Sequence, residues 1–549
     1  MSEKSEFQEL RSKIARYLRE RILRTKPEIR DEERPADPKP TLRNPVFKIP
    51  QARSVRPKEE NPALPNGRLD AVNIAAYRKR IQDGFDKTKT ATTPWIKLGI
   101  DLGTSSSKVV WRGESNVFPV CFDGDPLMLE SYLEPSLVTF KGANLLFGFD
   151  AIESSKHSTV SNFKMCLACV SRESGGCKIE NCSLTTWPID LFCAELKNQE
   201  IQFVNATHLG KLIAKAKRII ISELSGTFRK KPVPKWTANL AVPEVFIEQS
   251  PVADEFKRIL RTGWLMSEIF IKEPKLKNRR SLFECFVAAR EVSIESLGVL
   301  SDEEFGCSIY PEVGAEVASI VMSRLSEEGL YAFVDIGAGT VDASLFKYFR
   351  RDGKSNRPPF AADVSKDLGA SQLEVRASRE TVSNKSLSTF ELKRIKEIYN
   401  GLSETERLIY AEQFERLKRV VHEMKPRIQS FLQSIFRDAR NGKDSNIVNS
   451  KIRLVIGGGG SHLNFYKQAA ISAFTIKHAT SPIAPEQTTL QKPVDFQMSL
   501  PEDQFHRFAV AYGLSFPIED LPEMVFPKNV KPKELPKPRQ RDYGSIYEK

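Results

Sequence analysis

Residues 331–348 read YAFVDIGAGTVDASLFKY, an apolar run that ends at Asp335, a glycine turn, Asp342 and a second apolar run. The pattern predicts two strands joined by a tight turn, with one carboxylate on each side of that turn. An unpaired buried carboxylate is costly, so this hairpin predicts a positively charged partner close to both aspartates.

A second stretch of the chain repeats the pattern. Residues 97–111 read KLGIDLGTSSSKVVW, in which an apolar run again ends in an aspartate, Asp101, followed by glycine, Thr104 and another run. Either stretch alone is compatible with an ordinary hairpin. The shared placement of aspartate and threonine instead predicts two similar halves that face each other across a cleft.

The residue types of the two turns suit a phosphate. Glycine allows the backbone to approach an anion closely, and successive backbone N–H groups in a tight turn form an anion-binding concavity. An aspartate beside a phosphate requires a cation between them, and Mg²⁺ suits this position because it prefers oxygen ligands and retains water. The two hairpins together predict a magnesium–polyphosphate site.

A third glycine segment lies near the end of the globular region. Residues 452–463 read IRLVIGGGGSHL, and the segment that follows them is typical of a helix. A strand, a glycine turn and a helix in this order can bring backbone N–H groups against a nucleotide. The sequence has no GxxxxGK[ST] motif, so a P-loop is not expected.

The composition is that of a globular protein. The chain has 549 residues, 40% hydrophobic and 28% charged, so more than one folding unit is expected. It has neither a long apolar run nor a signal-peptide core, which favours a cytoplasmic protein with no membrane partner. The net charge of +13 is interpreted as diffuse surface charge, although acidic partners such as nucleic acid are compatible with it.

The expected organisation has three parts. Residues 1–95 form an N-terminal arm with a helix over 3–24, a linker rich in proline and charge, and a short helix over 69–86. Residues 96–516 alternate strand-like and helix-like segments, which is an α/β pattern with a mixed sheet. Residues 517–549 are rich in proline and lysine, and we expect a disordered tail there.

The three glycine segments, in this order, resemble the phosphate-1, phosphate-2 and adenosine motifs of the actin, sugar-kinase and heat-shock-chaperone ATPase superfamily. Further segments resemble the seventy-kilodalton heat-shock chaperones: PSLVTFKGANLLFGFDAIESSKHSTVSNFKMCL, YPEVGAEVASIV and FAVAYGLS. The resemblance implies an actin-like ATPase fold, in which two lobes, each with a mixed β-sheet and flanking helices, surround a central nucleotide cleft. Lobe I would span residues 96–330, and lobe II residues 331–516 with a return to lobe I.

The resemblance also implies ATP and Mg²⁺ as cofactors and assigns residues to the phosphates. Asp101, Glu312 and Asp335 would hold Mg²⁺ through water, and Lys164 would neutralise charge on the γ-phosphate. Asp335, with Asp342 and Thr340 nearby, would position the attacking water. The residues that would surround the phosphates are Gly103, Thr104, Ser105, Ser106, Gly337, Ala338, Gly339 and Thr340.

The nucleoside side of the site rests on weaker matches. Gly458, Gly459 and His462 would lie along the adenosine, where an imidazole can stack on the base. The helix segment at 415–423 resembles a nucleotide-contacting helix, which suggests Glu415, Lys418 and Arg419. A solvated charged helix face explains these last three residues nearly as well.

The chain also departs from the family that it resembles. Only about thirty residues follow Pro517, too few for a peptide-binding β-sandwich and a helical lid. The expected function is a chaperone-like nucleotide switch that hydrolyses ATP slowly and binds protein partners through its arm or lobe surfaces. The alternatives are a small-molecule kinase of the sugar-kinase type, an actin-like filament protein, and a scaffold that binds ATP without turnover.

Four of the eight cysteines cluster beside Lys164. Cys166, Cys169, Cys177 and Cys182 follow the spacing C-x2-C-x7-C-x4-C, and such pairs can chelate Zn²⁺ tetrahedrally. The competing interpretation is reduced structural thiols, as is usual for cysteines of a cytosolic chain. An iron–sulfur cluster is a third, less favoured alternative.

Overall fold

The computed structural model describes the globular part of the chain. The described residues are 69–90, 94–152, 159–161, 163–172, 198–225, 234–243, 250–296, 299–348, 350–351, 354–355, 360–365, 368–379, 411–441, 451–476 and 482–522. The helix expected over 3–24, the linker after it and most of the predicted tail lie outside these ranges.

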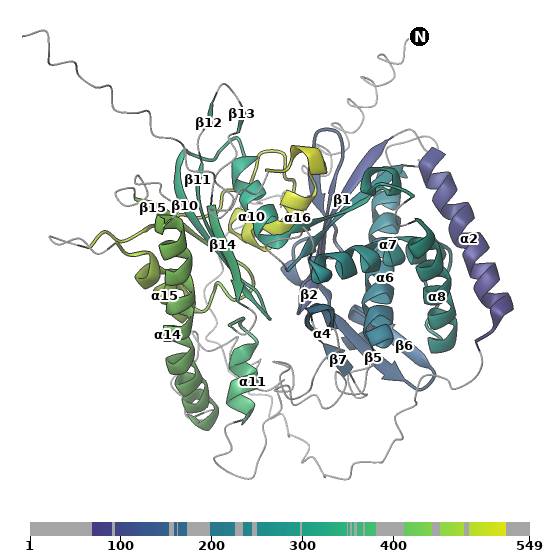
Figure 1. Ribbon diagram of the computed structural model, residues 1–549, viewed down its shortest axis with the longest axis horizontal. Coiled ribbons are helices and arrows are strands. Elements are labelled where there is room, and N and C mark those ends of the chain that lie inside the picture. Colours follow the sequence, from purple (N-terminus) through teal and green to yellow (C-terminus); the bar gives the residue numbers. More distant parts are fainter. Residues whose placement is uncertain are drawn as a thin grey trace, which may run out of the picture.

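The first unit is built on a six-stranded mixed sheet (Figure 1). The central path runs, in spatial order, through β3 (Val117–Pro119), β2 (Ser106–Arg112), β1 (Trp95–Asp101), β8 (Lys235–Val242) and β9 (Cys307–Pro311), and β4 (Glu134–Pro135) also pairs with β2. Strands β1 and β2 form an antiparallel hairpin, whereas β8 and β9 run parallel to β1. The register sets Asp101 opposite Lys108.

The second unit has a sheet with the same order of strand directions. Its strands are β14 (Phe360–Ser365), β11 (Val341–Tyr348), β10 (Gly329–Ile336), β15 (Ile452–Gly457) and β16 (Glu486–Gln487). Strands β10 and β11 form an antiparallel hairpin, and β15 and β16 run parallel to β10. Asp335 lies opposite Asp342 in this register, so the two segments singled out in the sequence occupy equivalent places in two similar sheets.

Two smaller sheets and several short helices complete the strand-rich parts. One contains β5 (Leu137–Lys141), β6 (Asn144–Phe147) and β7 (Thr159–Ser161), and the other β12 (Arg350–Arg351) and β13 (Lys354–Ser355). The short helices here are η1 (Leu129–Tyr132) and α3 (Phe149–Ile152). The described chain is therefore an α/β protein with two mixed sheets and two small antiparallel ones, and the sequence predicts this α/β class.

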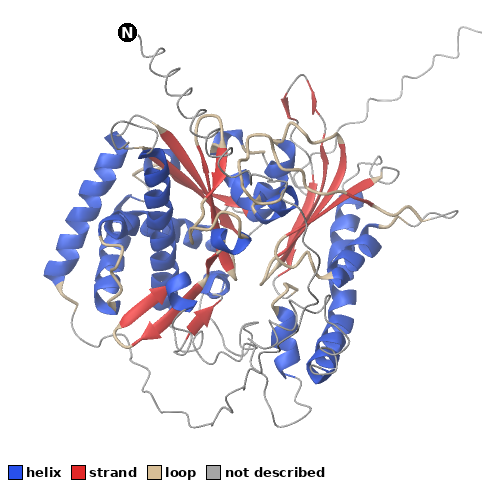
Figure 2. Ribbon diagram, turned by 180° about the vertical axis from the view of Figure 1, so that it is seen from behind, coloured by secondary structure: helices blue, strands red, loops and turns tan. Residues whose placement is uncertain are grey.

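Helices flank both main sheets (Figure 2). Those of the first unit are α2 (Ala71–Thr90), α4 (Phe163–Arg172), α6 (Asn198–Ser225), α7 (Pro251–Lys272), α8 (Arg279–Ser296) and α9 (Asp302–Phe305). Those of the second are α11 (Gln372–Arg379), α14 (Ala411–Asn441) and α15 (Asn464–Phe474). Helix α2 occupies the position of the helix expected over 69–86, and its Ile81 and Phe85 are buried in the core of the first unit.

Two helices lie between the main sheets (Figure 1). Helix α10 (Glu312–Val321) contacts β9 and β11, and α16 (Ala509–Leu514) packs on β1 and α10. Their apolar residues join those of both sheets in one core cluster, which includes Val110, Phe333 and Tyr512. The helices η4 (Glu502–Arg507) and η5 (Ile518–Asp520) flank α16.

The structured region extends beyond the predicted start of the tail. Leu521 is buried, and the Tyr310 hydroxyl donates a hydrogen bond to the carbonyl of Pro522. Residues 517–522 thus pack on the first unit, because an apolar side chain and a buried tyrosine both find partners there. Within the described part of the chain, no helix combines the length and apolar character that crossing a membrane requires.

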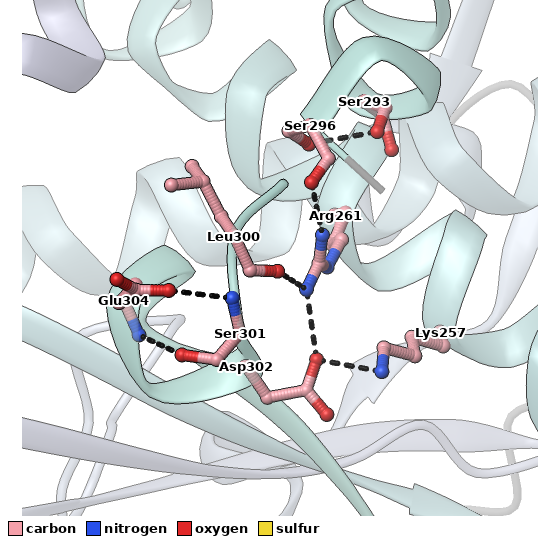
Figure 3. A network of polar contacts seen from close by, with 8 residues as sticks. All are labelled: Lys257, Arg261, Ser293, Ser296, Leu300, Ser301, Asp302 and Glu304. Atoms are coloured by element: carbon pink, nitrogen blue, oxygen red, sulfur yellow. Dashed lines mark hydrogen bonds and ion pairs between the residues drawn. The ribbon is translucent and has the colours of Figure 1, made fainter. Parts of the chain in front are cut away.

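A buried arginine connects α7 to the turn that precedes β9 (Figure 3). Arg261, of which 1% is exposed, donates to the carbonyls of Leu300 (3.1 Å) and Ser296 (3.4 Å) and pairs with Asp302 at 2.9 Å. Its guanidinium also lies over the ring of Phe305, 4.5 Å from the centroid. This network fixes the loop that leads to β9 and, directly after β9, to α10.

Replacing Arg261 should destabilise the protein substantially. We expect Arg261→Met to lower the free energy of unfolding by about 2–4 kcal/mol, because two carbonyls and Asp302 lose a buried donor. Lys257→Met is the matched control: Lys257 pairs with the same aspartate at 2.8 Å but is partly exposed, so a loss below about 1 kcal/mol is expected. Urea unfolding measures both, and equal losses would contradict this account.

Candidate functional site

The turns of the two hairpins meet in space. A Cβ atom placed on Gly339, in the turn of the second hairpin, would lie 3.0 Å from Oγ1 of Thr104 in the first and 2.9 Å from Sδ of Met165. A side chain here would force Met165 and Thr104 to shift, so glycine allows the two turns to approach this closely. The facing halves expected from the repeat are thus brought together at their turns.

The third glycine segment reaches the same place. Gly458 has a φ of 78°, and a Cβ there would lie 2.3 Å from Oδ1 of Asp335. The backbone N–H of Gly460 donates to the carbonyl of Ile336 at 2.8 Å, which joins this turn to the end of β10. All three glycine segments therefore converge around Asp335.

Two lysines are paired with carboxylates at this meeting point. Lys164, at the start of α4, pairs with Glu312, the first residue of α10, and both side chains are buried. Lys108 of β2 pairs with Asp101 of β1 across the first hairpin. One ion pair thus joins α4 to α10 and the other lies within the first hairpin, and Lys164 and Glu312 lie beside the hairpins, as the sequence analysis expected.

Three further carboxylates form a compact cluster. One oxygen from each of Glu316, Asp335 and Asp342 lies within 4.8 Å of the others. Glu316 is 0% exposed and neither of its carboxylate oxygens has a hydrogen-bond partner; the same holds for Oδ1 of Asp342, which is 1% exposed. The other oxygen of Asp342 accepts a hydrogen bond from the Thr340 hydroxyl at 3.0 Å. Buried carboxylate oxygens without partners are unusual, and a proton, an ordered water or a bound cation would satisfy them.

The pKa values of these acids are raised because the groups are buried close to other carboxylates. Burial raises the pKa of Asp335 to about 6, and Asp101 and Glu312 add to the rise, whereas Lys108 opposes it. Burial also raises the pKa of Glu316 well above its ordinary value, and the neighbouring carboxylates raise it further.

Burial and the neighbouring charges also shift the pKa values of Asp342 and Lys164. Burial and the carboxylate of Glu312 raise the pKa of Asp342 well above its ordinary value, against the hydrogen bond from Thr340. Burial alone would lower the pKa of Lys164, but Glu312 and Asp101 raise it, and the net pKa lies above the ordinary value. Lys164 therefore remains a buried cation.

The fully ionised site has more negative than positive groups. Its carboxyl groups are Asp101, Glu312, Glu316, Asp335 and Asp342, and the described cations that influence them are Lys108, Lys164 and Arg507. Full ionisation would leave two more negative than positive charges, but the raised pKa values of Glu316 and Asp342 favour their protonated forms unless a cation binds.

A series of buried polar contacts supports the turn of the first hairpin and the start of α4. The Ser136 hydroxyl donates to the carbonyl of Gly103 at 2.7 Å, and Ser107 lies 3.1 Å from Ser136 and 3.3 Å from Nε2 of His208. Burial lowers the pKa of His208 to about 3, so its imidazole is neutral. Asn205, on the same helix α6, donates to the carbonyl of Phe163 at 3.0 Å and thereby positions the residue before Lys164.

The residues assigned to the nucleoside lie at the edge of this arrangement. His462 is exposed at the third glycine turn. Glu415, Lys418 and Arg419 are exposed near the start of α14, where Lys418 and Glu415 pair with one another at 3.5 Å. That pairing is what a solvated helix face predicts, and it gives no support to a nucleotide role for Glu415 or Lys418.

The cysteine cluster lies largely outside the described side chains. Cys166 is buried and disulfide-bonded, whereas the side chains of Cys169, Cys177 and Cys182 are not among those that the structure describes. The expectation of a reduced thiol is therefore wrong for Cys166. A disulfide sulfur is not a thiolate ligand, so Cys166 cannot bind zinc in this oxidation state.

Three site residues were missed by the sequence analysis: Glu316, Lys108 and Arg507. Glu316 follows Glu312 by four residues on α10, and residues at this spacing share a helix face. Lys108 lies opposite Asp101 in the hairpin register. Both could have been found from these spacings, but Arg507 could not, because it follows no motif.

No protein-family model matches the sequence, and comparison with curated proteins finds no significant similarity. Arguments about function therefore rest on the chemistry of this site.

Removing the unpartnered carboxylate should stabilise the protein in the absence of divalent ions. We expect Glu316→Met to raise the free energy of unfolding by about 1–3 kcal/mol, because no described group compensates the buried acid. Glu284→Met is the matched control and should destabilise, since Glu284 is equally buried but accepts hydrogen bonds from Asp70, Asn73 and Arg280.

The gain from Glu316→Met should depend on pH. A carboxyl whose pKa is raised on folding binds its proton more readily in the folded state, so the wild-type protein gains stability from it as the pH falls. The advantage of the variant should therefore be larger at about pH 8 than at about pH 5. Urea unfolding with a chelator measures it, and a loss of stability at both pH values would contradict the charge imbalance.

Proposed function

We propose that this chain is a magnesium-dependent nucleotide switch that binds ATP and hydrolyses it slowly, of the type found in seventy-kilodalton heat-shock chaperones. The observation that carries the proposal is the convergence of three glycine turns on a buried cluster of carboxyl groups, some of whose oxygens have no hydrogen-bond partner. Glycine turns provide backbone donors for phosphates, and the carboxylates provide oxygen ligands for a metal. Either feature alone has simpler explanations, but their combination is that of a metal–polyphosphate site.

The repeated sheet topology supports an actin-like fold for this switch. Both main sheets have an antiparallel hairpin followed by parallel strands, and both hairpins turn toward the same point. Two lobes built in this way would enclose a nucleotide between their turns. The helices between the sheets, α10 and α16, would then connect the lobes and transmit a change in their separation.

The acidic cluster fits Mg²⁺. The unpartnered oxygens of Glu316 and Asp342 are hard ligands of the kind that this ion prefers, and together with Asp101, Glu312 and Asp335 they would hold it directly or through water. When bound, the ion would neutralise phosphate charge.

The other side chains have roles that follow from their environment. Lys164 remains protonated and could turn from Glu312 toward a phosphate, where it would stabilise negative charge in the transition state. Asp335, beside Asp342 and the third glycine turn, would help to position the attacking water. Thr340 donates to Asp342 and thereby orients that carboxylate.

The biological output that we propose is binding of protein partners, regulated by the bound nucleotide. A pull-down with ATP-bound and ADP-bound protein, with and without residues 1–68, tests this part separately, because this truncation keeps the packed helix α2. We expect at least one partner whose recovery depends on the nucleotide. Identical recovery in both states would contradict a switch while leaving the ATPase proposal intact.

The ATPase proposal is tested by single-turnover hydrolysis with Mg²⁺. We expect Lys164→Ala and Asp335→Asn each to slow hydrolysis by about a hundredfold or more, the usual effect of removing one group that stabilises a transition state. Lys451→Ala is the control, because Lys451 pairs with Glu486 at the exposed start of β15, and it should have no effect.

Two results would overturn this proposal. Wild-type protein that binds no adenine nucleotide in calorimetry with Mg²⁺ would exclude it, and unchanged hydrolysis in both variants would show that the site is assigned wrongly. Phosphate transfer to an added sugar in place of phosphate release would favour the small-molecule kinase.

A further inference from the structure

Arg507 lies between the third glycine turn, in the second unit, and helix α16, which packs on the first unit. It is the last residue of η4 and precedes α16, which packs on β1, the strand that ends in Asp101. Its guanidinium lies against the third glycine turn. A Cβ on Gly459 would be 3.3 Å from Nη2, 3.4 Å from Cζ and 3.6 Å from Nη1, so the flat face of the group covers this glycine.

The neighbouring histidine fixes this position. The Nε2 atom of His506 lies 3.4 Å from the Ser461 hydroxyl, which donates to the carbonyl of Gly458 at 2.9 Å. The other ring nitrogen, Nδ1, lies 2.6 Å from the carbonyl of Asp503 within η4. The contacts of His506 thus attach η4 to the glycine turn and restrict where Arg507 can reach.

Arg507 is a partly buried cation without a counter-ion in contact. Among the described residues, none forms a hydrogen bond or ion pair with it, and its Nε atom is buried without a partner. The carboxylates of Asp335 and Asp101 act on it only at longer range. Because an arginine remains charged at any physiological pH, this position favours an anion close to Asp335.

We propose that Arg507 binds the phosphate chain of the nucleotide directly, and this inference rests on the function proposed above. A guanidinium presents a planar set of donors that matches two phosphate oxygens at once. The phosphate chain would then be contacted from three sides, by Lys164 on α4, by Arg507 at the end of η4 and by the glycine turns. Contact with the adenine ring in place of the phosphates is the alternative that the experiment separates.

The test is calorimetric titration of the full chain with Mg-ADP and, separately, with adenosine. We expect Arg507→Gln to weaken ADP binding about tenfold to a hundredfold, the usual effect of losing hydrogen bonds to a charged group. Adenosine, which has no phosphate, should bind within about twofold of wild type. Arg507→Lys should lie between, because lysine keeps the charge and loses the planar set of donors.

Arg453→Gln is the matched control. Arg453 lies in the same unit, on β15, and pairs with Glu327 at 2.5 Å, so its removal should leave ADP affinity unchanged. Thermal unfolding without ligand shows whether each variant remains folded.

The possible failures are distinguishable. ADP binding by wild type that Arg507→Gln does not weaken overturns this inference alone. Equal weakening of ADP and adenosine also overturns it, because the side chain then supports the base or the turn. No ADP binding by wild type overturns the proposed function and, with it, the phosphate contact of Arg507.

Discussion

The structure depends on keeping several carboxylates together, mostly buried, where two sheets meet. Burial and mutual repulsion both disfavour their ionised forms, and Glu316 has no compensating hydrogen bond in the described chain. Such an arrangement persists only if the surrounding fold holds it. The backbone ladders of both hairpins position Asp101, Asp335 and Asp342, and the start of α10 positions the two glutamates.

Burial of apolar side chains between the two sheets opposes the repulsion among the carboxylates. Buried residues of both sheets, of α10 and of α16 form one apolar cluster directly beside the acids, with aromatic rings packed edge to face around Tyr512. Loosening the site would separate these rings from their partners. Burial of apolar surface therefore offsets the cost of holding the carboxyl groups together.

The sequence was sufficient for the hairpins because their signals are local. Apolar runs that end in aspartate and glycine predicted β1, β10 and β15 near their observed bounds. Helix α10 brings Glu312 and Glu316 to one face because it begins directly after β9, at Glu312, and runs to Val321. Arg507 was missed for a different reason. Its role depends on a tertiary approach to Gly459, and no spacing along the chain encodes that.

The ion pairs of the site also bear on how its ligands would interact. Without ligand, Lys164 pairs with Glu312 and Lys108 with Asp101, so the cations that suit a phosphate chain are engaged by the carboxylates that suit a metal. A phosphate chain alone would compete for the lysines and leave their carboxylates unpaired, and a metal alone would do the reverse. If both bind as proposed, each removes the cost that the other creates. Bound metal would then raise the affinity for the nucleotide, and bound nucleotide would raise the affinity for the metal by the same factor.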